Sequence, residues 1–227
     1  MKTIIKVLLS ISIVLLTYFC IMSVLTPIRF EETKDSREKI IIKRLTDIRK
    51  AELEFRDQKG RYTASLDTLI DFVKTARKKM VMKEGSLTDK QLEAGLTEVA
   101  AVKIVRRGNP TEIAANGLQG FVRDTAYVSM LEAIFPKDYT VETINELAII
   151  PFSNKEKFTM RVKNDYVNSA GIKIPLFEAS ATYESYLYDL DHQEMLNAID
   201  IQEKLERFAG LKVGSVDEPN NNAGNWE

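Results

Sequence analysis

Residues 45–73 read LTDIRKAELEFRDQKGRYTASLDTLIDFV, and this stretch decides the fold. Its first half is densely charged, yet residues that are nearly all apolar recur in it at intervals of three and four positions. This apolar stripe begins a few residues upstream, at Ile41. The repeating positions are Ile41, Leu45, Ile48, Glu52 and Phe55, and Glu52 is the one polar member. A narrow apolar stripe of this kind predicts a helix with one packed side and its other sides in water.

The end of this helix is marked by Gly60, which can adopt the left-handed conformation that often follows a helix. Tyr62 can then fold back toward the helix. Ser65 is predicted to cap a second helix that runs to about Met80. The apolar face of that second helix consists of Leu66, Leu69, Ile70 and Val73.

Upstream of the stripe lies a long apolar segment. Residues 1–28 read MKTIIKVLLSISIVLLTYFCIMSVLTPI, with Lys2 and Lys6 before an uncharged span over residues 7–28. As a helix this span is about 33 Å long, which matches the hydrocarbon thickness of a bilayer. A cleaved signal peptide is the alternative, but its core is usually shorter and ends in small residues, so the pattern favours a retained transmembrane anchor. Phe19 before Cys20 disfavours lipidation of that cysteine.

The charges around the span predict its topology. Lysines precede it, whereas the short segment after it mixes basic with acidic residues, so the positive-inside rule keeps the N-terminus in the cytoplasm. We therefore expect a single-pass protein of the inner membrane whose C-terminal domain is periplasmic. Cys20 is the only cysteine, so the rest of the chain can form neither a disulfide nor a thiolate metal site.

Composition argues against nucleic acid as a partner. The chain has 227 residues, with 32 basic and 33 acidic side chains, so no overall field attracts a polyanion.

Beyond residue 80 the pattern changes from helical to alternating. A third helix is predicted from Thr88 or Asp89 to about Val99. Alternation around residues 158–162 and 172–176 predicts two strands joined by a hairpin, and Pro175 is expected to place the second strand at a sheet edge. The remaining candidates are a strand over residues 181–188, a last helix over about 192–208 ended by Gly210, and a returning strand over 211–216.

This order predicts an α+β fold, with an N-terminal transmembrane helix, a long amphipathic helix, further short helices and a small antiparallel sheet. We expect the anchor at residues 1–28, the amphipathic helix at 29–60, one globular domain at 61–218 and a polar tail at 219–227. The tail is rich in asparagine, and disorder is its simplest interpretation.

The run over residues 45–73 resembles the part of type IV pilins and type II secretion pseudopilins where the first helix ends before Gly and Tyr. The resemblance implies a membrane helix that continues into an amphipathic helix packed on an antiparallel sheet. Pilins also carry a Gly, an aromatic residue and a Glu at the start of the membrane helix. Residues 1–6 offer none of these, so polymerisation by the pilin route is not expected. The later part, with the ending EPNNNAGNWE, resembles single-span envelope proteins of Bacteroidota, which implies a location.

One short segment could hold a metal or an acid-base pair. Residues 188–194 read YDLDHQE and combine the only histidine, His192, with Asp189, Asp191 and Glu194. The same spacing fits a helix cap by Asp191 with Glu194 three residues later, and this interpretation is preferred. No second histidine supports zinc, so no catalytic, cofactor or metal site is assigned.

Two features could bind a partner. Arg77, Lys78 and Lys79 form a basic cluster that is either a solvated face or a contact for anionic lipid or an acidic protein. Trp226, the only tryptophan, could anchor the tail in a partner's pocket.

The sequence therefore favours a membrane-anchored envelope scaffold or interaction protein that is not an enzyme. Its expected partners are membrane lipid, through the anchor, and other envelope proteins, with no cofactor, and its oligomeric state is left open. The alternative is a membrane-anchored hydrolase or a small-ligand or metal-binding protein that uses residues 189–194.

Overall fold

The computed structural model describes residues 2–227. It is a mixed fold of helices and small antiparallel sheets, headed by one long apolar helix, as the sequence predicts. The chain divides into two compact units. The first combines the chain up to Phe72 with Tyr139–Glu227, and the second is Val73–Asp138. The second unit lies within the span that the sequence assigns to one domain over residues 61–218.

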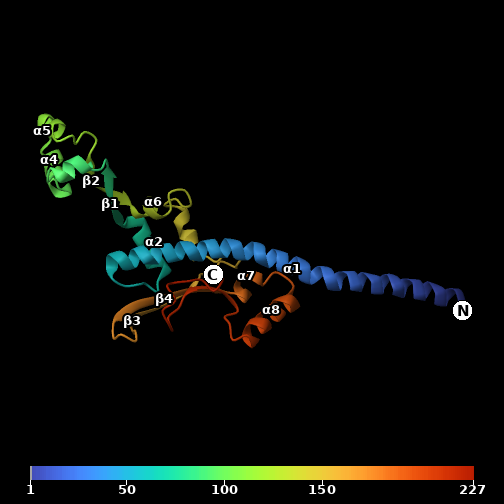
Figure 1. Ribbon diagram of the computed structural model, residues 1–227. Coiled ribbons are helices and arrows are strands. Elements are labelled where there is room, and N and C mark those ends of the chain that lie inside the picture. The colour runs from blue at the N-terminus through green and yellow to red at the C-terminus, as the bar shows by residue number, and fades with distance from the viewer. Residues whose placement is uncertain (1) are drawn as a thin grey trace. The chain divides into compact units, whose positions relative to one another are not determined.

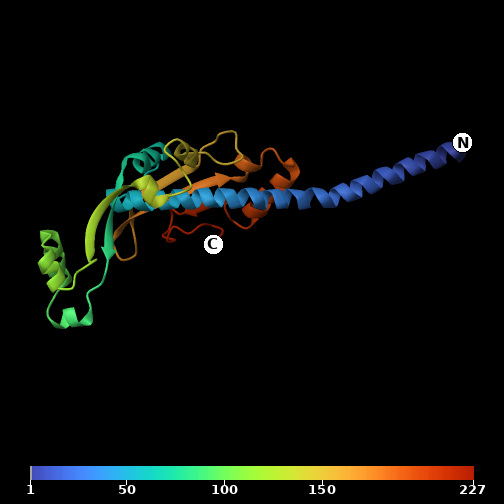
Figure 2. The same ribbon diagram turned by 90° about the horizontal axis from the view of Figure 1, so that it is seen from above.

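Helix α1 covers Lys2–Lys59 without a break (Figure 1). Its apolar half is exposed along its length, from Ile4, which is 65% exposed, to Val24, which is 61% exposed. Of the helices in residues 2–227, α1 alone is long and apolar enough to cross a membrane, a test that a signal sequence also passes. Pro27 lies inside the helix, where it lacks a backbone donor, and the ribbon of α1 is curved (Figure 2).

The second half of α1 carries the core of the first unit. The predicted stripe is confirmed, since Ile41, Leu45, Ile48 and Glu52 are 0% exposed and Phe55 is 5% exposed. This half contacts strands β4 and β5 of the sheet. The helix ends as predicted, because the Gly60 N–H donates to the Arg56 carbonyl over 2.7 Å and Gly60 has a φ of +73°.

The sheet of the first unit has the order β3-β4-β5 and is antiparallel throughout. Its strands are β3 (Thr159–Val167), β4 (Lys173–Thr182) and β5 (Gly210–Gly214), so the predicted hairpin and the returning strand are confirmed. The edge position predicted from Pro175 is wrong, because β4 is the central strand. Pro175 is tolerated there since it lies opposite an irregularity in β3, and pairing with β5 begins only at Glu178.

The strand predicted over residues 181–188 is also wrong. After Thr182 the chain forms helix α7 (Tyr183–Leu187), because Tyr183, Tyr186 and Leu187 are buried at the three- and four-residue spacing of a helix. Helix α8 (His192–Lys204) follows and is shorter than predicted, since Glu206 takes a φ of +54° and cannot continue it. The 3-10 helix η1 (Thr143–Ala148) completes this unit.

Helix α2 (Leu66–Thr75) begins as predicted, with the Ser65 side chain accepting the Thr68 N–H over 3.2 Å. It does not reach Met80, and residues 77–84 instead form strand β1 (Arg77–Glu84), paired over its whole length with β2 (Val122–Ser129). The ladder with β2 satisfies the backbone groups of this charged segment.

The rest of the second unit consists of short helices. They are α3 (Asp89–Glu93), α4 (Glu98–Arg107), α5 (Pro110–Ala115) and α6 (Met130–Ile134). The predicted third helix is interrupted, because Gly95 takes a φ of +79° between α3 and α4. Ala101, Leu118 and Phe121 form a small core in this unit.

Candidate functional site

The carboxylates of residues 189–194 do not converge. Asp189 accepts two hydrogen bonds from the Arg37 guanidinium, over 2.5 and 2.8 Å, and Arg37 also donates to the Tyr186 carbonyl over 2.6 Å. The hydrogen bond from Arg37 lowers the pKa of Asp189. Asp189 thus fastens the end of α7 to α1 as an ionised carboxylate.

Asp191 is the N-cap of α8, as predicted. Its side chain accepts the N–H groups of Gln193 and Glu194 over 3.0 and 3.1 Å. His192 is exposed at the first position of the helix, and Glu194 accepts a bond from Asn197 over 3.4 Å. Within residues 2–227, no group of three or more His, Cys, Asp or Glu side chains is placed to hold a metal ion. The geometry therefore gives Asp189 and Asp191 structural tasks and assembles no metal centre from residues 189–194.

The basic cluster lies on strand β1. Arg77 and Lys79 are exposed, and Lys78 between them is half-buried. A polar cleft of about 350 Å³ includes Arg77 together with Lys74 and Tyr127, which is 64% exposed. Binding of a partner at this cluster stays a prediction.

The tail is folded, and the expectation of disorder is wrong. The Asn225 N–H donates to the Lys212 carbonyl over 3.0 Å, and the Lys212 N–H donates to the Asn225 side chain over 3.0 Å. The Asn225 amide also donates to the Gly210 carbonyl over 2.9 Å. The Gly214 N–H also donates to the Ala223 carbonyl over 2.9 Å, and Val213 and Gly224 form an antiparallel bridge. The tail thus pairs with β5 through its backbone and through the Asn225 side chain, which explains why a polar segment is ordered. Trp226 is half-buried against Gly224, and its role as an anchor for a partner remains a prediction.

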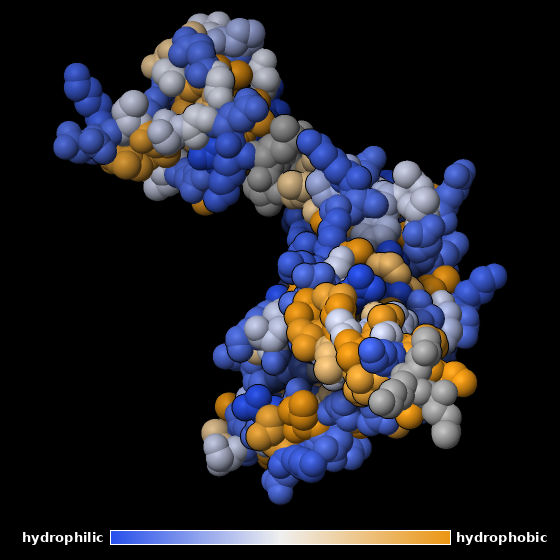
Figure 3. Space-filling model, turned by 90° about the vertical axis from the view of Figure 1, so that its right-hand side faces the viewer, coloured by the Kyte–Doolittle hydropathy of each residue, from blue (hydrophilic) through white to orange (hydrophobic). Residues whose placement is uncertain are grey.

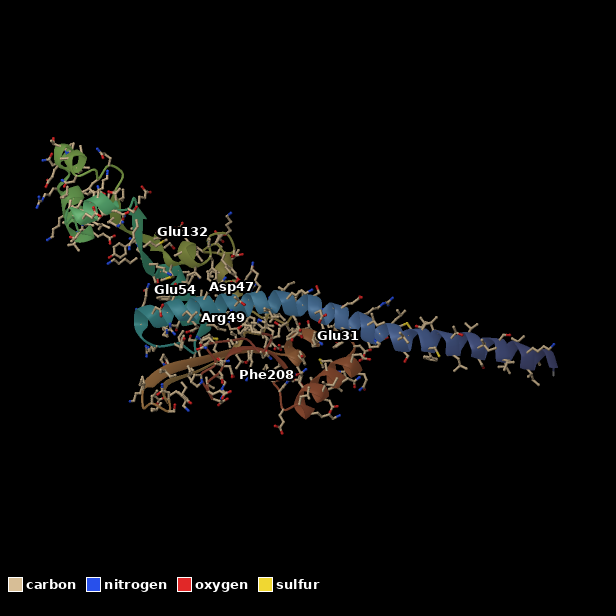
Figure 4. All side chains as sticks on the ribbon, in the orientation of Figure 1. Glu31, Asp47, Arg49, Glu54, Glu132 and Phe208 are labelled. Atoms are coloured by element: carbon tan, nitrogen blue, oxygen red, sulfur yellow. The ribbon has the colours of Figure 1, made fainter. Side chains whose placement is uncertain are left out.

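Two charged residues of α1 reach other segments of the first unit. Asp47 and Arg49 lie on opposite sides of the helix (Figure 4). Asp47 is 1% exposed and accepts a hydrogen bond from the Tyr139 hydroxyl over 3.1 Å. Arg49 donates to the Asn222 carbonyl over 3.0 Å and pairs with Glu227 over 2.7 Å, so the tail is fastened to α1 as well as to β5.

Glu52 is the most unusual group in the core. It is 0% exposed, its Oε2 accepts the Thr63 N–H over 3.2 Å, and its Oε1 has no hydrogen-bond partner. Burial raises the pKa of this carboxyl from 4.5 to about 8. The sequence signal was already present, because Glu52 is the single polar member of an apolar stripe. Its side chain links α1 to the turn that follows Gly60.

A cleft that sequence reasoning missed lies between α1 and α8. It has a volume of about 290 Å³ and is lined by Pro27, Phe30, Glu31 and Lys34 from α1 and by α8 residues that include Glu194 and Ile201. The Lys34 ammonium pairs with the Glu31 carboxylate over 2.5 Å. No periodic pattern in either segment indicates this contact, because the two helices are far apart in the chain.

Comparison with family models, with curated proteins and with solved structures gives no match for this chain.

Proposed function

We propose that this protein is a membrane-anchored interaction protein of the cell envelope, with a pseudopilin-like domain that binds other envelope proteins of a secretion or assembly system. The single observation that carries the proposal is the continuity of α1. One helix, Lys2–Lys59, has an exposed apolar first half and a second half whose stripe is buried in the domain. The apolar half and the half that carries the core of the domain are therefore one continuous helix.

The exposed half of α1 supports a place in the membrane. Large apolar side chains from Ile4 to Val24 are mostly 50–70% exposed around the whole helix. A soluble protein rarely exposes an apolar surface of this extent, whereas lipid solvates it favourably. Lys2 and Lys6 precede the span, which by the positive-inside rule supports a cytoplasmic N-terminus and a periplasmic domain at the inner membrane.

The second half of α1 supports the pseudopilin-like part of the proposal. A helix that leaves the membrane and packs its apolar stripe on a small antiparallel sheet is what the resemblance over residues 45–73 implies. Here the stripe is buried and the helix contacts β4 and β5. A scaffold of this kind presents its loops and sheet edges to partners, and the basic cluster on β1 and Trp226 are the proposed contacts.

The proposal assigns no chemistry to the chain. In the alternative, Asp189, Asp191, His192 and Glu194 would serve a hydrolase or a metal site. Asp189 is bound to Arg37 and Asp191 caps α8, so neither carboxylate points to a shared centre. Replacing His192 with Ala distinguishes the two, since an anchored interaction protein keeps its partner binding and a metal-dependent enzyme loses its activity.

Protease accessibility tests the topology, and crosslinking tests the binding. Protease added to intact spheroplasts should digest the domain and leave a small fragment that contains the anchor, whereas a protected domain would refute the orientation. Crosslinking of the full-length chain in its own membrane should capture envelope proteins, with fewer captured by a variant that replaces Arg77, Lys78 and Lys79 with Gln. Equal capture by the variant and the native chain would remove the basic cluster from the proposal.

A further inference from the structure

The cleft between α1 and α8 lies where the apolar half of α1 ends. Pro27 and Phe30 line it from α1, and Ile201 lines it from α8. The uncharged span ends at Ile28, and a helix rises about 1.5 Å per residue, so the α1 residues of the cleft lie within about 10 Å of that end. If the span crosses a bilayer, the cleft lies in or just outside the headgroup layer, which adds about 5–7 Å to each side of the hydrocarbon.

Two clefts that share Phe30 place α8 and the residues just before it beside the end of the span. Phe30 is 6% exposed and also lines a second, smaller cleft of about 190 Å³. That cleft brings Thr26 and Arg29 of α1 next to Leu190 and Asp191, which immediately precede α8. Because α1 has no break between span and domain, no flexible linker lets α8 move away from the membrane.

Two apolar side chains at the C-terminal end of α8 are exposed. Ile201 is 55% exposed, and Leu205, the C-cap residue of α8, is 54% exposed. The two lie four residues apart and therefore on the same side of the helix. Figure 3 looks at the end from which the apolar half of α1 projects, and apolar side chains lie on this face beside α1 as well as on it. The cation of the cleft is already neutralised, because Lys34 pairs with Glu31. An apolar contact is therefore better supported than an ionic one.

We propose that the C-terminal end of α8 rests on the surface of the membrane that α1 crosses, with Ile201 and Leu205 in the phospholipid headgroup layer. This inference depends on the anchoring proposed above. Helices with an apolar side lie in this layer with that side several ångströms below the surface. The contact holds the first unit against the membrane at a fixed height.

A site-specific fluorophore tests the contact in the full-length chain. In a Cys20→Ser background, Ile201→Cys is labelled with a polarity-sensitive dye and the protein is reconstituted in phosphatidylethanolamine and phosphatidylglycerol nanodiscs. Ile172→Cys is the matched control, because Ile172 is 59% exposed but lies in the β3–β4 hairpin. That hairpin is close to the far end of α1, since Asn164 of β3 accepts the Tyr62 N–H over 2.9 Å.

The expected result is quenching by headgroup spin-labelled lipid that is at least about threefold stronger at position 201 than at position 172. Raising the salt to about 0.5 M should leave this ratio unchanged, because the contact is apolar. Equal quenching at the two positions in a chain that is embedded in the nanodisc would overturn the contact and leave the anchoring intact. A chain that does not enter the nanodisc at all would overturn both proposals, and circular dichroism of each variant shows that it is folded.

Discussion

Replacement of Glu52 with Gln should remove most of the dependence of folding stability on pH between about pH 5 and pH 9. In the native chain the Glu52 carboxyl is 0% exposed and its Oε1 has no partner, so the core favours the neutral form. Its pKa is about 8 in the folded chain, against 4.5 for the ordinary carboxyl. The amide side chain of the Glu52→Gln variant would keep an acceptor for the Thr63 N–H and cannot ionise.

The sign and size follow from linkage. A carboxyl whose folded pKa is raised gives its full stability below the unfolded pKa, and this stability is lost as the pH rises toward the folded pKa. With pKa values of 4.5 and about 8, the native chain should lose about 4 kcal/mol of unfolding free energy between about pH 5 and pH 9. Burial also raises the pKa of Glu38, so ionisation of Glu38 lowers the unfolding free energy further as the pH rises. The Glu52→Gln variant should retain only the pH dependence that comes from Glu38.

Urea unfolding of the full-length chain in detergent micelles measures this difference. Trp226 is the only tryptophan and lies in the first unit, so its fluorescence reports the unit that contains Glu52. The matched control is Glu203→Gln on the exposed surface of α8, which should keep the native pH dependence. Equal stability of the native chain at about pH 5 and pH 9 would refute a buried, neutral Glu52. An equal loss of stability in the native chain and in Glu52→Gln over this range would refute it as well.

Three further substitutions test individual contacts by the same unfolding measurement. Arg37→Lys should lower the unfolding free energy by about 1–3 kcal/mol, because an ammonium cannot bond Asp189 bidentately and also reach the Tyr186 carbonyl. An unchanged unfolding free energy would show that these bonds do not hold α7 to α1. Asp191→Ala should cost about 1 kcal/mol through loss of the α8 cap, whereas Asp191→Asn should cost little, and equal losses would argue against capping. Gly214→Ala should lower the unfolding free energy by at least about 2 kcal/mol, because Gly214 has a φ of +75° and a Cβ would lie 2.2 Å from the Phe177 carbonyl oxygen. Native stability in this variant would contradict the close approach of the two backbones.

Local signals predicted the parts of the fold that depend on neighbours in the chain. The stripe from Ile41 to Phe55, the stop at Gly60 and the caps at Ser65 and Asp191 all follow from spacing and side-chain chemistry within one or two helical turns. The hairpin between β3 and β4 was equally local. The apolar half of α1 was evident from composition alone, whereas its insertion in a membrane stays a proposal.

Three of the failures share a cause, which is pairing with another segment of the chain. Residues 77–84 became strand β1 because β2 supplies their hydrogen-bond partners about 45 residues later. Pro175 is tolerated in a central strand because the β3 irregularity and the short β5 leave its position unpaired. The tail is ordered because Asn225 pairs with β5, and a composition rich in asparagine gives no indication of that pairing.

The candidate site was predictable only in its members. Residues 189–194 were identifiable as polar and titratable, but the partner that claims Asp189 is Arg37, which no local pattern connects to it. The cleft that places α8 beside the end of the apolar span depends likewise on two helices that are remote in sequence.

The intact mass of the native protein, measured after fractionation of its own cells, tests the central claim most directly. The full chain, with residues 7–28 retained, is expected in a membrane fraction that resists extraction at high pH and dissolves in detergent. A mature chain that begins beyond residue 20, or one recovered without detergent in the soluble fraction, would contradict the anchor and every proposal that depends on it.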